Sequence, residues 1–90
     1  MSHNQIQLAN ELGERFPNMP IPLRSAIAVF AGVQNRVGHT KQNDRALMAA
    51  IAYARHNFTN YDNLFRYGYT KEQAREAVRR EVYRIINLWK

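Results

Sequence analysis

The chain contains no cysteine, which excludes disulfide bonds and thiolate chemistry and suits a reducing compartment such as the cytoplasm. It has only four glycines and three prolines among 90 residues, too few for a fibrous or low-complexity protein. Its longest apolar runs, at residues 26–33 and 46–54, are too short to cross a bilayer, and no secretory signal pattern opens the chain. We therefore expect a soluble cytoplasmic protein that does not contact a membrane.

Acidic residues are also scarce. Seven acidic residues stand against 13 basic ones, which gives a formal net charge of +6. Ten of the basic residues are arginines, whose planar guanidinium groups match phosphate and carboxylate geometry. This balance favours a polyanionic partner, nucleic acid above all, although charge that only maintains solubility would give the same composition.

What the chain does contain is helical periodicity. Apolar residues recur at helical spacing over residues 4–16, 22–37, 44–57, 60–67 and 71–89. The second and third of these helices are apolar on most sides, which is typical of buried central helices. We predict an all-α fold: one compact domain, residues 1–90, built as a bundle of about five helices.

Helix boundaries are marked by familiar residue types. Three prolines between Pro17 and Pro22 separate the first two helices, and Pro22 suits the first turn of the second. Thr70 with Gln73 forms a capping-box pattern that starts the last helix. Glycines are predicted to end two helices and an asparagine to cap another, namely Gly38, Gly68 and Asn43.

The richest polar segment is the run from Ala54 to Asp62, at the joint between the third and fourth helices. It contains Arg55, His56, Thr59, Tyr61 and Asp62. A structural interpretation makes Thr59 and Asp62 a capping box, with the two cations at the negative end of the third helix dipole. A functional interpretation places Arg55, His56 and Tyr61 around a bound phosphate, with Asp62 orienting the imidazole.

The same segment carries a family resemblance. The strings Arg36-Val37-Gly38-His39-Thr40, Arg55-His56-x-x-Thr59-x-Tyr61-Asp62 and Gly68-Tyr69-x-x-x-x-Ala74-Arg75 resemble a small family of mostly bacterial proteins catalogued as a domain of unknown function. The resemblance covers about residues 20–90. It implies a shared fold and a shared polar cluster, and no particular reaction.

Aromatic residues concentrate near this joint. Six of the ten lie between Tyr53 and Tyr69, interleaved with Arg55 and Arg66, a pattern that suits stacking on single-stranded bases. We expect Phe58 and Phe65 to pack in the core. Three tyrosines then remain as stacking candidates: Tyr61, Tyr67 and Tyr69. For the aromatic residues as a group, core packing is the favoured interpretation.

The leading hypothesis is a non-enzymatic binding protein for nucleic acid or another phosphorylated partner. Its predicted contact residues are Arg36, Arg45, Arg55, His56, Tyr61, Arg66, Arg79 and Arg80, with Arg75 and Arg84 extending the basic face of the last helix. That face could equally be a solvated surface with ion pairs. Sequence-specific DNA readout is not expected, because the short fourth helix carries Arg66 as its only cation.

Two alternatives remain open. One is a protein-interaction or homo-oligomerising module with an acidic protein partner. The other is a metal-independent phosphodiesterase that uses His56, with Arg36 or Arg45 stabilising charge. No cofactor is expected, and no metal either, because the possible ligands His39, His56 and Asp62 lack the spacing of a helical metal pair.

Overall fold

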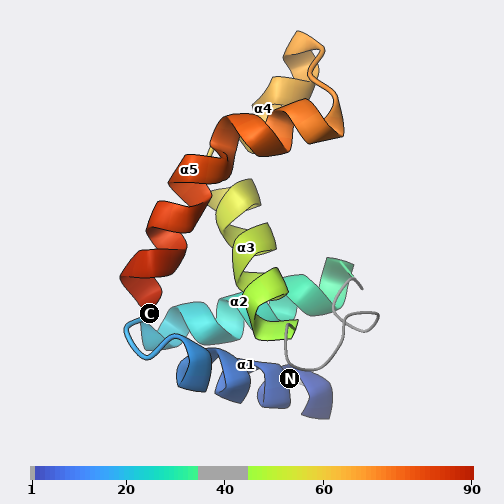
Figure 1. Ribbon diagram of the computed structural model, residues 1–90. Coiled ribbons are helices and arrows are strands. Elements are labelled where there is room, and N and C mark those ends of the chain that lie inside the picture. The colour runs from blue at the N-terminus through green and yellow to red at the C-terminus, as the bar shows by residue number, and fades with distance from the viewer. Residues whose placement is uncertain (1, 35–44) are drawn as a thin grey trace.

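The computed structural model describes residues 2–34 and 45–90, which form five α-helices and one short 3-10 helix (Figure 1). The helices are α1 (His3–Arg15), α2 (Ile21–Gln34), α3 (Arg45–Asn57), α4 (Tyr61–Leu64), the 3-10 helix η3 (Phe65–Tyr67) and α5 (Lys71–Trp89). No strand occurs among these residues. The predicted all-α bundle of about five helices is confirmed.

The helices are arranged in two layers, of which one is the α1–α2 hairpin and the other contains α3, α4, η3 and α5 (Figure 1). Helices α1 and α2 lie side by side and antiparallel, α3 packs against both, and α5 packs along α3 (Figure 1). Helix α5 runs back toward the α1–α2 connection, where the Asn18 N–H donates to the Trp89 carbonyl at 3.0 Å. The α4–η3 segment lies at the far end of α5 (Figure 1).

One apolar core connects the two layers. Phe16, at the end of α1, is fully buried and meets the Trp89 ring edge to face at 6.4 Å between centroids. Helix α3 presents mainly alanines to the core, and their small side chains let neighbouring helices approach closely. The buried α3 residues are Ala46, Ala49, Ala50 and Ala54.

Local capping signals explain several helix ends. Thr70 and Gln73 form the predicted capping box of α5, and Gly68 ends η3 as predicted, with a left-handed backbone at a φ of 87°. Ser2 and Gln5 form a second capping box at the start of α1, which we did not predict. The predicted caps Gly38 and Asn43 lie outside the described residues.

Helix α2 is less buried than its composition suggests. We expected it to be covered on most sides, yet Ala26 and Val29 are exposed, as is Met48 on the neighbouring α3. The reason is that α2 packs mainly against α1 and α3, which cover one side of the helix. The buried residues Ile27, Ala28 and Ala31 mark that side.

Candidate functional site

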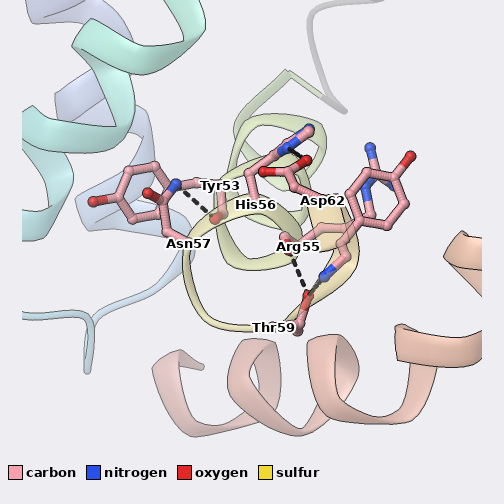
Figure 2. Close-up of polar contacts among 7 residues, drawn as sticks. Tyr53, Arg55, His56, Asn57, Thr59 and Asp62 are labelled. Carbon is pink, nitrogen blue, oxygen red and sulfur yellow. Dashed lines mark hydrogen bonds and ion pairs between the residues drawn. The ribbon is translucent and has the colours of Figure 1, made fainter. Parts of the chain in front are cut away.

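The joint between α3 and α4 is held by bonds from side chains to the backbone. The Thr59 hydroxyl donates to the Arg55 carbonyl at 2.5 Å and accepts from the Tyr61 N–H at 3.2 Å. The Asn57 side chain donates to the Tyr53 carbonyl at 3.1 Å (Figure 2). The Thr59 bond satisfies the Arg55 carbonyl, one of the last four carbonyls of α3, which the end of the helix would otherwise leave without an intrahelical partner.

The predicted Thr59–Asp62 capping box is wrong. The N-cap of α4 is Asn60, whose side chain makes no capping bond, and Thr59 lies one residue too early to bond the third helical N–H. Helix α4 is only four residues long, and the Asp62 carboxylate turns toward α3 instead of capping α4 (Figure 2).

Asp62 contacts His56. The His56 Nδ1 and Asp62 Oδ1 atoms are 2.8 Å apart, and the His56 ring stands edge to face against Tyr61 at 5.1 Å. The Phe30 ring lies 5.9 Å from the imidazole on another side. When Nδ1 donates to the carboxylate, the Nε2 of a neutral ring is the acceptor, so the pair has the geometry of an oriented general base.

Tyr61 occupies the centre of this cluster and is only 2% exposed. The Arg55 guanidinium carbon lies 5.0 Å from the Tyr61 ring centroid, and the Phe65 ring stands edge to face against the same ring, also at 5.0 Å. A cation over an aromatic face is a favourable arrangement. The ring is thus used for packing, and the structure does not leave it open to stack on a base.

Arg45 does not join the cluster. Its Nε and Nη2 atoms both contact Glu11 Oε2, at 2.9 and 2.7 Å, which ties the start of α3 to α1. Arg55 is ten residues later on the same helix, or about 15 Å along its axis. Arg36, the other predicted contact residue before α3, lies outside the described residues.

A groove between α3 and α5 does bring several arginines together. Arg55 from α3 lines it together with Arg75 and Arg79 from α5, and its volume is about 330 Å³. Glu72 and Glu76 share the α5 side of the groove, and the Arg79–Glu76 ion pair is long, at 3.5 Å, and exposed. The remaining lining residues are Ile51, Val82 and Tyr83. The groove therefore combines cations, carboxylates and an apolar surface.

The other predicted cations, Arg66 and Arg80, are exposed but do not line the groove. Arg66 lies on η3, at the far end of the molecule from the α1–α2 connection. Arg80 follows Arg79 on α5 but points about 100° further round the helix, and it does not line the groove. The structure thus gathers Arg55 and Arg79, adds Arg75, and leaves Arg66 and Arg80 on the adjoining surface.

The exposed aromatic side chains differ from those expected. Phe58 and Phe65, predicted to be core residues, are substantially exposed, and Tyr67 is 77% exposed. Tyr69, one of the stacking candidates, is exposed, and Tyr83, which sequence reasoning did not single out, is exposed beside the groove. Periodicity could not find Tyr83, because it stands on a polar face of α5 where a single aromatic residue breaks no pattern.

Residues 2–34 and 45–90 contain neither a cluster of metal ligands nor a membrane span. Within this part of the chain, no three histidine, cysteine or acidic side chains lie together as metal ligands would. None of the helices it contains is both long enough and apolar enough to cross a membrane.

The helical fold and the polar joint between α3 and α4 place the chain in a class of small all-α proteins without an established activity. The family model for the uncharacterized conserved proteins designated DUF2293 matches residues 11–90, and the chain belongs to this family. The match includes the segment 20–90 of the predicted resemblance and extends it into α1. Neither the curated proteins nor the solved structures contain a match.

Proposed function

We propose that this protein is a non-enzymatic, cytoplasmic nucleic-acid-binding protein that contacts its partner through the surface of η3 and α5. By the η3–α5 surface we mean the exposed side chains of residues 65–84. The observation that carries the proposal is that exposed aromatic rings and excess positive charge occur in the same part of the molecule.

The η3–α5 surface has a positive net charge. Residues 65–84 contain six basic and three acidic residues, and all six basic side chains are exposed. The basic residues are Arg66, Lys71, Arg75, Arg79, Arg80 and Arg84. Cations grouped on one helix and its preceding turn can follow a phosphate backbone and release its counterions.

The exposed rings support the same partner. Phe65, Tyr67 and Tyr69 flank Arg66 and Lys71 within seven residues, and all three rings are exposed. Unpaired bases stack on aromatic side chains whatever their sequence, while neighbouring cations hold the phosphates. These three exposed rings are therefore suited to stacking on single strands of any sequence.

Fluorescence anisotropy with short labelled single-stranded and duplex oligonucleotides tests the proposal. We expect binding at low salt, with an affinity that falls steeply between about 50 and 200 mM salt because phosphate contacts release counterions. Absence of binding at low salt would overturn the proposal. It would favour the alternative of a protein-interaction or homo-oligomerising module, which light scattering would then test.

A matched pair of variants locates the surface. Arg66→Gln should weaken binding and reduce the salt dependence by about 0.7 in the log–log slope, as expected for one lost contact with a single-strand phosphate. Arg15→Gln removes the same charge from the exposed end of α1 and should leave both quantities unchanged. Equal effects of the two variants would show that net charge, and not this surface, determines binding.

A second candidate function, hydrolysis of phosphodiesters, is favoured by the His56–Asp62 contact alone. In such a reaction the Nε2 atom would accept a proton from the water that attacks phosphorus, and would return it to the leaving oxygen as the ester bond breaks. If so, His56→Ala should lower turnover of an activated aryl phosphodiester by about 100-fold or more while preserving helical circular dichroism. No turnover by the unmodified protein would remove this candidate.

A further inference from the structure

The groove between α3 and α5 has the size and lining of a site for one small ligand. Its volume of about 330 Å³ lies at the lower end of the range for ligand pockets. Ile51 and the buried Val82 supply an apolar surface, and the half-exposed Tyr83 ring stands beside them. A flat, partly apolar group with a charged neighbour would match this combination.

We propose that this groove holds one unpaired nucleotide, with its base against Tyr83 and its phosphate on the arginines of α5. The inference rests on the proposed function and adds to it a site for one unpaired base. A base in a duplex is stacked and paired, so only an unpaired or flipped base can turn into a groove between two helices.

The arginines are placed to hold the phosphates of such a strand. Arg75 and Arg79 are four residues apart, so they lie on one face of α5 and about 6 Å apart along its axis. The Arg79 guanidinium pairs with Glu76 at a long 3.5 Å, and both side chains are mostly exposed. A pair of that kind is weak and exchanges readily for a phosphate oxygen.

The two carboxylates in the groove predict which base it prefers. Glu72 and Glu76 repel phosphate but accept hydrogen bonds, and they lie on the same side as the arginines. Guanine presents two adjacent donors, N1–H and N2–H, which match a carboxylate in a two-bond arrangement. Adenine and cytosine offer one amino group beside a ring acceptor, and thymine or uracil offers one N–H between two carbonyls. We infer that the groove prefers guanine and disfavours thymine and uracil.

The test compares oligothymidine with the same strand carrying one central guanine. The protein should bind the guanine-containing strand at least about fivefold more tightly, the lower bound for one good two-bond contact. The double variant E72Q/E76Q should bring this ratio close to one while binding to oligothymidine is retained or strengthened, because two negative charges are removed. Glu81→Gln, on a part of α5 that does not line the groove, is the matched control and should leave the ratio unchanged.

A second variant tests the stacking contact. Tyr83→Leu should weaken single-strand binding about tenfold and leave duplex binding unchanged, because the ring is needed only for an unpaired base. Circular dichroism should match the unmodified protein, since the Tyr83 side chain is half-exposed.

The outcomes separate this inference from the proposed function. One outcome would overturn the nucleotide site and leave the nucleic-acid-binding function standing. In that outcome, single strands and duplexes bind with equal affinity. The groove variants then change neither this equality nor the ratio of affinities for the guanine-containing strand and oligothymidine. If no nucleic acid binds at low salt, both are overturned.

Discussion

The α1–α2 hairpin and the η3–α5 surface expose different chemistry to solvent. The hairpin's exposed large apolar residues are aliphatic, and its two basic residues are matched by two acidic ones. The η3–α5 surface instead exposes aromatic rings among an excess of cations. Both regions contain arginine, so the presence of this residue alone does not distinguish them. The difference lies in what each arginine contacts.

Arg24, near the start of α2, holds the α1–α2 connection in place. The Arg24 Nη2 atom lies 3.2 Å from the Met19 carbonyl oxygen and 3.4 Å from that of Pro17, so its guanidinium braces the α1–α2 connection. The same guanidinium crosses α1 at Gly13, where an added Cβ would lie 2.8 Å from Nη1. On α5, by contrast, Arg79 makes one long exposed ion pair with Glu76. Arg24 therefore stabilises the fold, whereas Arg79 is one of the cations to which the proposed binding is assigned.

The largest expected effect is on the free energy of unfolding, from a core substitution in the hairpin that should not change nucleic-acid affinity. Leu12 is fully buried in α1, so Leu12→Ala should lower the free energy of unfolding by about 2–5 kcal/mol through lost burial and a residual cavity. Urea denaturation measures this loss, with the exposed Ile6→Ala on the same helix as the control, expected to cost much less. Nucleic-acid affinity of the folded fraction should not change. A parallel loss of affinity would show that the hairpin also binds.

An intermediate effect is expected at the turn that leads into α5. Gly68 has a φ of 87°, and no atom of the described residues lies within 4 Å of the position that a Cβ would take there. Gly68→Ala should therefore cost about 1–2 kcal/mol from backbone strain alone, and Gly68→Asn should lose less, because asparagine tolerates this conformation better. Single-strand affinity should also fall for Gly68→Ala, since the turn positions Tyr67 and Tyr69. Equal stability of the alanine and asparagine variants in urea denaturation would contradict the strain argument.

Features determined by a few neighbouring residues could be predicted from the sequence. The capping box of Thr70 and Gln73 and the burial of Val78, Val82 and Ile86 follow from residue spacing along α5. The helix end at Gly68 follows from the residue type alone. The exposure of α2 could not be predicted in this way. An apolar face is buried only if another helix covers it, and helical spacing does not show how many neighbours pack against α2.

In the candidate site, too, contacts that depend on packing between helices could not be predicted from the sequence. Asp62 was predicted either to form a capping box with Thr59 or to orient His56. The sequence does not distinguish these two roles, because Thr59 and His56 both lie within six residues of Asp62. It was harder still to predict from the sequence which aromatic residue near this joint is buried. Helix α4 has only four residues, which is too few to show an apolar stripe in the sequence. Tyr61 is buried because α4 packs against α3 and α5, whereas Phe58 and Phe65 remain substantially exposed. The Arg45–Glu11 contact joins residues 34 positions apart, beyond the reach of local patterns.

The smallest expected effect tests whether position or charge count controls binding. Arg45→Gln and Arg80→Gln each remove one positive charge, but Arg45 is paired with Glu11 at 2.7 Å and Arg80 is exposed on α5. Arg45→Gln should therefore leave nucleic-acid affinity within about twofold, whereas Arg80→Gln should weaken it and lower its salt dependence.

The stability cost of Arg45→Gln should stay below about 1 kcal/mol, because the Glu11 side chain is 39% exposed and solvent screens the pair. A double-mutant cycle with Glu11→Gln, measured by urea denaturation, isolates the pair's contribution from other effects of each change. If Arg45→Gln weakened binding as much as Arg80→Gln, the nucleic acid would be responding to total charge, and the contrast between hairpin and α5 would have no functional meaning.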